Sequence, residues 1–259
     1  MDYREFERAA VEAAVAAGRL VRPWAGRARG VTRKTSVSDL VTDLDREAEA
    51  EITAALRASF PEHDIWGEES GGQAERRFVW HVDPIDGTTN FVHGLPGYCV
   101  SVALADGGRP VAGAVYDPTA DELFSACAGG GARVDGRPLH VAAGELGEAL
   151  LGTGIPTRQP YRDVTLGVLP AVCARVRNVR NLGAAALHLS YVAAGRLTGF
   201  WEPTLNPWDC AAGVILVREA GGRATDLAGE EWHAGVRGVV ATNGTIHEPL
   251  LALLAGGPH

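Results

Sequence analysis

The segment spanning residues 80–91 constrains the fold of this 259-residue chain most, because an apolar, β-prone run leads directly into polar and turn-forming residues. It reads Trp-His-Val-Asp-Pro-Ile-Asp-Gly-Thr-Thr-Asn-Phe. Asp83 and Asp86 are so close together that both stay charged beside an apolar strand only if something positive neutralises them. Hard divalent cations take carboxylate and carbonyl oxygens as ligands. The pattern therefore favours a magnesium site where a buried strand ends.

The residues that come directly after Asp86 are suited to binding a phosphate group. Gly87 permits a tight turn, and the backbone N–H groups of residues 87–89 are available to an anion if a helix or an anion-binding nest begins there. The alternative is an ordinary strand-ending turn in which the aspartates accept hydrogen bonds from their own backbone. The segment alone leaves both interpretations open.

Four further acidic residues bear on that choice. Glu68 and Glu69 follow a short apolar run, Asp209 opens a helix just after a proline, and Asp45 lies in the first turn of another helix. Each also has an ordinary explanation, as part of a solvated surface or as a partner of the helix dipole.

Hydrophobic periodicity predicts the elements that carry these residues. In the first half we expect an amphipathic helix over residues 3–24 and a second helix that opens at Thr42 with a capping box. The predicted buried stripe of the second helix is Leu44, Ala48, Ile52 and Ala55. Four β-prone runs follow, at residues 78–82, 98–105, 111–116 and 122–126.

The sequence of the second half predicts helices and strands in alternation. Helical patterns at residues 164–175, 184–194 and 208–220 alternate with apolar runs at 176–180, 197–201 and 236–241. Such alternation is typical of an α/β arrangement. Because no flexible linker interrupts the chain, we expect one continuous domain over residues 1–259, with an N-terminal α+β half (1–148) and a C-terminal α/β half (149–259).

Composition excludes several classes of protein. A net charge of −8 argues against nucleic acid as a partner. The four cysteines show neither a disulfide pattern nor zinc-ligand spacing, which favours a reducing cytoplasm. No apolar segment is long enough to cross a membrane. Neither a nucleotide-binding glycine loop nor a histidine beside a recognisable nucleophile is present.

Four segments in this order resemble the inositol monophosphatase family, within the fructose-bisphosphatase-like superfamily. They are residues 39–45 (Asp-Leu-Val-Thr-Asp-Leu-Asp), 67–70 (Gly-Glu-Glu-Ser), 83–91, and 207–209 (Pro-Trp-Asp) continuing to 219–222 (Glu-Ala-Gly-Gly). The resemblance covers most of the chain, and the third segment is highly specific. It implies a layered α-β-α-β-α sandwich, a homodimer and inhibition by lithium.

The same resemblance implies a set of metal ligands. Glu68, Asp83 and the backbone carbonyl of Ile85 would bind one Mg²⁺ ion. Asp83, Asp86 and Asp209 would bind a second, so that Asp83 bridges the two. A third, more weakly bound ion would lie near Glu68, held with the help of another acidic side chain, that of Asp45.

The resemblance also implies catalytic and substrate-binding roles. Glu68, Thr88 and Asp83 would be catalytic, with Thr88 orienting the attacking water. The N–H groups of Gly87 and Thr88 would hold phosphate oxygens, and Glu202 would accept hydrogen bonds from ring hydroxyls. The implied substrate contacts as a whole are Glu68, Ile85, Asp86, Gly87, Thr88, Gly183, Ala184, Ala185, Glu202 and Asp209.

The expected reaction is magnesium-dependent hydrolysis of a small phosphate monoester, with inositol 1-phosphate as the leading substrate. Ala184 departs from the family pattern, in which many members have Ser or Thr, so one side-chain hydroxyl contact is missing. The alternatives are a phosphatase for fructose 1,6-bisphosphate, histidinol phosphate or adenosine 3′,5′-bisphosphate, or a regulatory binding protein of the same fold.

Overall fold

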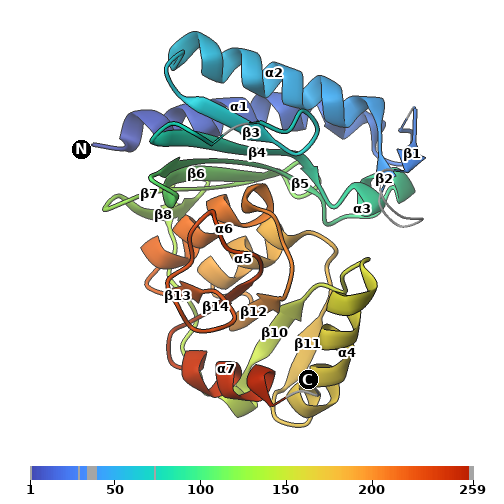
Figure 1. Cartoon of the computed structure of the whole chain (residues 1–259), viewed down its shortest axis with the longest axis vertical. Helices are drawn as coiled ribbons and strands as arrows, with labels where there is room; N and C mark the ends of the chain where they lie inside the picture. The colour runs from blue at the N-terminus through green and yellow to red at the C-terminus, as the bar shows by residue number, and fades with distance from the viewer. Residues whose placement is uncertain (1, 29, 34–39, 73, 257–259) are drawn as a thin grey trace.

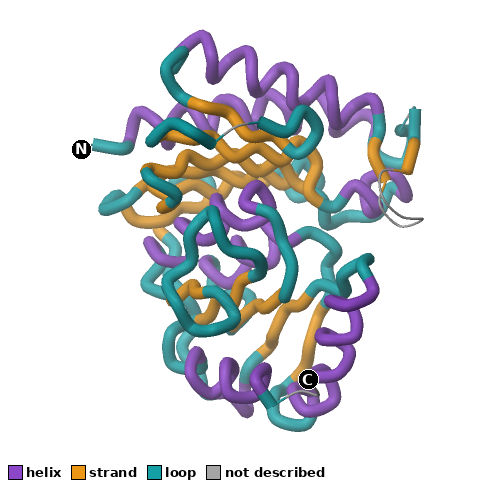
Figure 2. The backbone as a smooth tube through the Cα atoms, in the orientation of Figure 1, coloured by secondary structure: helices purple, strands orange, loops and turns teal. Residues whose placement is uncertain are grey.

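The computed structural model describes residues 2–28, 30–33, 40–72 and 74–256, so Asp39 of the first family segment lies outside the described residues. Two β-sheets alternate with three helical layers, as Figures 1 and 2 show. The predicted layered α-β-α-β-α sandwich is confirmed. None of the helices in the described ranges is both long and apolar enough to span a membrane.

The first sheet has seven strands in the order β3-β4-β5-β6-β7-β8-β9. Strands β3 and β4 are parallel, and every other neighbouring pair is antiparallel. The strands are β3 (Asp64–Gly67), β4 (Phe78–Asp86), β5 (Cys99–Asp106), β6 (Arg109–Asp117), β7 (Glu122–Cys127), β8 (Gly131–Val134) and β9 (Arg137–Pro138).

Strand β4 is longer than the predicted run at residues 78–82. It extends to Asp86, and its pairing with β5 shifts register between Asp83 and Asp86. Pro84 falls within this irregular stretch, where its missing N–H costs no regular ladder hydrogen bond. Both aspartates are therefore held by the sheet itself, rather than by a turn beyond it.

Helices α1 (Arg4–Val21) and α2 (Asp43–Ser59) cover the outer face of this sheet. Both predicted helices are confirmed, including the capping box at Thr42. The predicted burial of Ala55 is wrong, because Ala55 is exposed and Leu56 is buried in its place. Leu56 continues the four-residue spacing of the stripe, which keeps it on the face toward the sheet.

The second sheet has five strands in the order β11-β10-β12-β14-β13. Strand β10 is parallel to both its neighbours, whereas β14 is antiparallel to β12 and β13. The strands are β10 (Leu150–Thr153), β11 (Asn178–Arg180), β12 (Gly199–Glu202), β13 (Arg223–Thr225) and β14 (Val239–Thr242). The three predicted second-half strands correspond to β11, β12 and β14, with shifted ends.

Helices α5 (Ala185–Ala193) and α6 (Pro207–Glu219) form the layer between the two sheets. Their apolar side chains share one core with strands of both sheets. Residues 210–217 of α6 are all buried, which explains a sequence that is apolar around the whole helix. Because this shared core joins residues 1–148 to residues 149–259, we propose that the two halves fold as a single domain.

The remaining helices are short or lie on the outside. Helices α4 (Gln159–Cys173) and α7 (His247–Ala255) cover the far face of the second sheet. Helix α3 (Thr88–His93) follows β4 directly. The minor elements are the 3₁₀ helices η1 (Arg22–Trp24) and η2 (Leu146–Glu148) and the paired strands β1 (Thr32–Arg33) and β2 (Leu40–Val41).

Candidate active site

Asp83 lies at the irregular end of β4 and is 2% exposed. Its Oδ1 accepts a hydrogen bond of 3.1 Å from the Ile85 N–H. This is the local bond expected of an ordinary aspartate turn. The rest of the carboxyl group points toward acidic residues from two other elements, so the local bond does not account for the whole arrangement.

Strand β3 places Glu68 next to Asp83. It runs parallel to β4, with Gly67 opposite Val82. The Glu68 N–H then donates to the Val82 carbonyl at 3.1 Å, which fixes Glu68 beside the end of β4. Parallel pairing thus brings together two acidic positions from different segments.

Helix α6 supplies the third carboxylate, that of Asp209. Asp209 is the third residue of α6, and its Oδ2 accepts a hydrogen bond of 2.7 Å from the Asn206 N–H as part of a capping box. The Ser101 hydroxyl donates to the Trp208 carbonyl at 3.0 Å. Ser101 is opposite Asp83 in the β4–β5 register, so this bond holds the start of α6 against Asp83.

These carboxyl groups interact directly. The carboxyl groups of Glu68 and Asp209 lie near enough to Asp83 to change its protonation. Burial raises the pKa of Asp83 well above its ordinary value, and the negative charges of Glu68, Asp86 and Asp209 raise it further. The pKa of Asp209 is raised well above its ordinary value for the same reasons. The group therefore strongly favours neutralisation, by protons or by cations.

Asp86 faces the helix layer. Its Oδ2 accepts a hydrogen bond of 2.6 Å from the Ala186 N–H in the first turn of α5. Burial raises the pKa of Asp86 to about 7, although the bonds from the backbone of Ala186 and Ala185 act in the opposite direction. Asp86 thereby connects the first sheet to the predicted substrate segment at residues 183–185.

Asp45 and Thr88 form a second contact to the site. Asp45 is fully buried, and its Oδ2 accepts hydrogen bonds from the Thr42 N–H at 2.8 Å and the Thr42 hydroxyl at 2.5 Å. The Thr88 hydroxyl lies 3.4 Å from Asp45 Oδ1 and 3.0 Å from the Ile85 carbonyl. Asp45 thus caps α2, as its ordinary explanation required, and also lies beside the predicted catalytic threonine.

Gly87 occupies a position that only glycine suits. Its φ is +90°, in the region that other residues avoid. A Cβ at this position would lie 2.7 Å from the Gly97 carbonyl oxygen and 3.2 Å from the Ala184 Cβ. The turn between β4 and α3 therefore packs tightly against the segment that precedes α5.

A pocket of ≈ 540 Å³ opens beside Asp86 and Asp209. All three predicted substrate residues of segment 183–185 line it, together with Glu202 at the end of β12. Burial raises the pKa of Glu202 well above its ordinary value. A side chain on Gly154 would overlap the Glu202 carboxylate, so a glycine there leaves the space that this carboxylate occupies.

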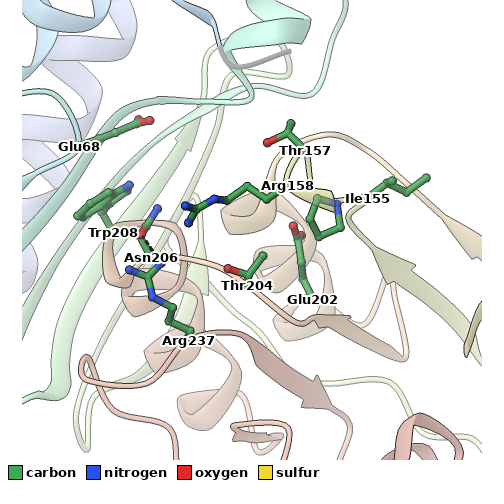
Figure 3. Close-up of a pocket in the computed structure, with 10 residues that line it drawn as sticks. Glu68, Ile155, Thr157, Arg158, Glu202, Thr204, Asn206, Trp208 and Arg237 are labelled. Atoms are coloured by element: carbon green, nitrogen blue, oxygen red, sulfur yellow. Dashed lines mark hydrogen bonds between the residues drawn. The ribbon is translucent and has the colours of Figure 1, made fainter. Parts of the chain in front are cut away.

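An adjoining pocket of ≈ 440 Å³ shares Ile155, Thr157 and Glu202 with the first. Figure 3 shows Glu68 and Glu202 on opposite sides of it, with the Arg158 guanidinium extending between them. Arg237 donates to Asn206 Oδ1 at 3.3 Å. The sequence interpretation did not include the loop at residues 155–158, because its polar residues resemble those of any exposed loop.

Two polar side chains that hold the substrate segment were also missed, half-buried Asn90 and buried His188. The Asn90 Nδ2 donates to the carbonyls of Gly97 and Leu182, at 2.7 Å each. His188 accepts from the Leu182 N–H at 3.0 Å and contacts the Ala184 carbonyl at 2.8 Å through its other nitrogen. Burial lowers the pKa of His188 to about 4, so the neutral ring makes both bonds. The only sequence signal for this role is that Asn90 follows the acidic turn.

The donor chemistry of the site fits a hard divalent cation. Several buried or half-buried carboxylates meet beside a backbone carbonyl, and their raised pKa values show that protein groups do not neutralise them. Among the described residues, no three Asp, Glu, His or Cys side chains are already arranged as ligands around one point. Asp86, Asp209 and Asp45 instead direct one oxygen each to a helix start.

The raised pKa values predict how the metal-free protein responds to pH. At pH values between the ordinary aspartate pKa of 3.8 and the pKa of about 7 in the folded protein, Asp86 is protonated to a greater extent in the native state than in the unfolded state. Stability is therefore lost as pH rises through this window. The buried histidines act oppositely, but only below their ordinary pKa of 6.5.

We therefore expect the melting temperature in a chelator to fall between about pH 6.5 and pH 8, by several degrees. One proton of difference changes the free energy of unfolding by about 1.4 kcal/mol per pH unit. Thermal unfolding of the wild type and of Asp86→Asn, which removes one titrating group, measures the slope. A melting temperature that rises over this range, or an unchanged slope in the variant, would contradict the prediction.

Comparison with known proteins gives a consistent result. The model of the inositol monophosphatase family matches residues 2–257. An inositol-1-monophosphatase from Synechocystis sp. is 39% identical over 261 residues, covering 99% of this chain and 91% of that protein. A Nus factor SuhB from Pseudomonas aeruginosa is 43% identical over 229 residues, covering 85% of this chain and 84% of that protein. The solved structure of a Thermotoga maritima IMPase has a TM-score of 0.89 at 36% identity, covering 98% of this chain and 97% of that one.

Proposed function

Because this chain belongs to the inositol monophosphatase family, we propose that it hydrolyses inositol 1-phosphate to inositol and phosphate, with magnesium as its cofactor. Family membership makes the chain a phosphatase that acts on phosphate monoesters. The observation that carries the proposal is the group of interacting carboxylates from β4, the turn after β3 and the start of α6, beside a pocket that Glu202 lines.

The ligands of the cofactor are proposed from this group. Glu68, Asp83 and the Ile85 carbonyl would hold one ion, and Asp83, Asp86 and Asp209 would hold a second. When bound, magnesium neutralises negative charge, activates a water molecule and stabilises the leaving oxygen.

Residues of the chain itself supply the remaining functions. The Thr88 hydroxyl, placed by Ile85 and Asp45, orients the attacking water. The N–H groups of Gly87 and Thr88 come at the start of α3, where no intrahelical carbonyl accepts their hydrogen bonds, and they hold phosphate oxygens. Asp45 contributes to the site of a third, weaker ion near Glu68.

The pocket supports a polyol as the alcohol part of the substrate. Glu202 is a half-buried carboxylate that can accept hydrogen bonds from ring hydroxyls. The segment of Gly183, Ala184 and Ala185 forms the facing wall. Because Ala184 has no hydroxyl, this wall recognises the ring through backbone groups and shape, and selectivity for inositol rests mainly on Glu202.

The proposal is tested by phosphate release from inositol 1-phosphate, fructose 1,6-bisphosphate and histidinol phosphate, with magnesium and with EDTA. We expect release only with magnesium, and the largest kcat/KM for inositol 1-phosphate. A higher kcat/KM for another ester would keep the metal site and change the substrate. Equal rates in EDTA would refute the magnesium mechanism.

The family membership also supports three accompanying proposals: the enzyme is inhibited by lithium, forms a homodimer and works in the cytoplasm. Lithium titration of the same assay and the molecular mass in solution test the first two. A regulatory binding protein of the same fold is not favoured, because all the proposed metal-ligand positions carry the expected residues.

A further inference from the structure

The turn that presents Glu68 is held by a residue of the outer helix layer. Glu49, on α2, is 3% exposed although it carries a carboxylate. Its Oε2 accepts a hydrogen bond of 2.7 Å from the Glu69 N–H, and its Oε1 accepts one of 2.8 Å from the Ser70 N–H. Both oxygens of one buried side chain therefore bind the two residues that directly follow Glu68.

The local chain is built to admit this carboxylate. A Cβ on Gly67 would overlap the end of the Glu49 side chain, so the glycine leaves the space it needs. The Gly67 N–H donates to the Gly71 carbonyl at 3.1 Å, which closes the turn. With the bond from the Glu68 N–H to Val82, the turn is fastened to β4 on one side and to α2 on the other.

The same face of α2 reaches a second part of the site. Asp45 lies four residues before Glu49, so the two side chains project from one face of the helix. Asp45 lies within hydrogen-bond distance of the Thr88 hydroxyl after β4, whereas Glu49 bonds the turn after β3. Helix α2 therefore sets the relative position of two segments that carry proposed catalytic residues.

We propose that Glu49 is a positioning residue, which holds the Glu68 carboxylate in the orientation required to bind the magnesium ion. The inference rests on the proposed function, because it assigns Glu68 as a ligand. Two charge-assisted hydrogen bonds to backbone N–H groups restrict the turn, and partners behind a ligand commonly change metal affinity ~10–100-fold.

Glu49→Gln tests the proposal with little change of shape. Glutamine offers one carbonyl oxygen, and its amide group would face the second backbone donor, so one bond is lost. We expect the dissociation constant of Mg²⁺, measured by calorimetry without substrate, to rise ~10–100-fold. The matched control is Glu51→Gln, an exposed position two residues away on the same helix, which should leave this constant unchanged.

Thermal unfolding separates positioning from a merely structural role. A lower melting temperature in Glu49→Gln with unchanged Mg²⁺ affinity would overturn the proposal. Gly67→Ala is the second variant, and it can be used even if Glu49→Gln does not fold. Its new methyl group, which does not lie on α2, would displace the Glu49 carboxylate. It should weaken Mg²⁺ binding as well, and unchanged affinity would again contradict the role.

Different results would contradict the proposed function and the role of Glu49. Wild-type protein that neither binds Mg²⁺ in calorimetry nor releases phosphate in its presence would refute the proposed function. Wild-type protein that does both, together with variants of unaltered Mg²⁺ affinity, would refute only the role of Glu49.

Discussion

Asp83→Asn should lower kcat by more than ~10³-fold with inositol 1-phosphate and magnesium, while the protein remains folded. Loss of a single electrostatic stabiliser in an active site costs ~10²–10³-fold. Asp83 is proposed to bind both ions, so its replacement by a neutral amide should exceed that range. The amide keeps the shape of the side chain and an oxygen for the Ile85 N–H.

Stability provides the internal check for this variant. Burial and the surrounding acidic groups disfavour the charged form of Asp83, so in a chelator at pH 8 Asp83→Asn should melt at the same or a higher temperature than the wild type. Asp163→Asn, at an exposed position on α4, is the control for the substitution itself. Turnover within tenfold of the wild type at saturating magnesium would remove Asp83 from its bridging role.

Gly87→Ala should reduce both stability and activity. A non-glycine residue at a φ of +90° costs ~1–3 kcal/mol, and the contact of the new methyl group with the Gly97 carbonyl adds ~1–3 kcal/mol. Relief of that contact moves the N–H groups proposed to hold phosphate. We expect a loss of about 2–6 kcal/mol in the free energy of unfolding, and a decrease in kcat/KM of at least ~10²-fold.

Gly244→Ala separates the two effects. Gly244 has a φ of +88°, but nothing lies within 4 Å of the position of its Cβ. The control variant therefore carries the same backbone strain without the steric contact, and it should lose stability while keeping wild-type kcat/KM. Denaturant unfolding and steady-state kinetics of both variants decide the matter. Equal kcat/KM in both variants would show that the packing around Gly87 has no influence on phosphate hydrolysis.

The elements that the sequence predicts well are those with long periodic patterns. Helices α1, α2, α5 and α6 and the central strands of the first sheet lie where apolar spacing placed them. The extent of β4 was underestimated, because Pro84 and the two aspartates look like the end of a strand. Only pairing with β5 keeps that segment in the sheet. Short strands such as β10 and β13 likewise depend on neighbours that no local pattern shows.

For the candidate site, the acidic residues could be found from sequence because they lie in four ordered segments that match a family pattern, although each residue alone has an ordinary explanation. The structure brings Glu68, Asp83 and Asp209 into contact from three elements. Their roles as ligands stay predictions until a cation is measured. The supporting residues Asn90, His188 and Glu49 could not be found, because each binds backbone groups far away in sequence and backbone groups leave no side-chain signature.

The floor and the walls of the two pockets are built from different kinds of segment. The acidic floor belongs to strand β4, to the turn that β4 and α2 fasten, and to the first turn of the buried helix α6. The walls come mostly from connecting segments, at residues 154–158, 181–184 and 204–206. Exchange of these connections is therefore the natural route to re-engineering the choice of ester, since a transplanted loop would alter which alcohol fits while leaving the hydrolytic machinery in its rigid frame.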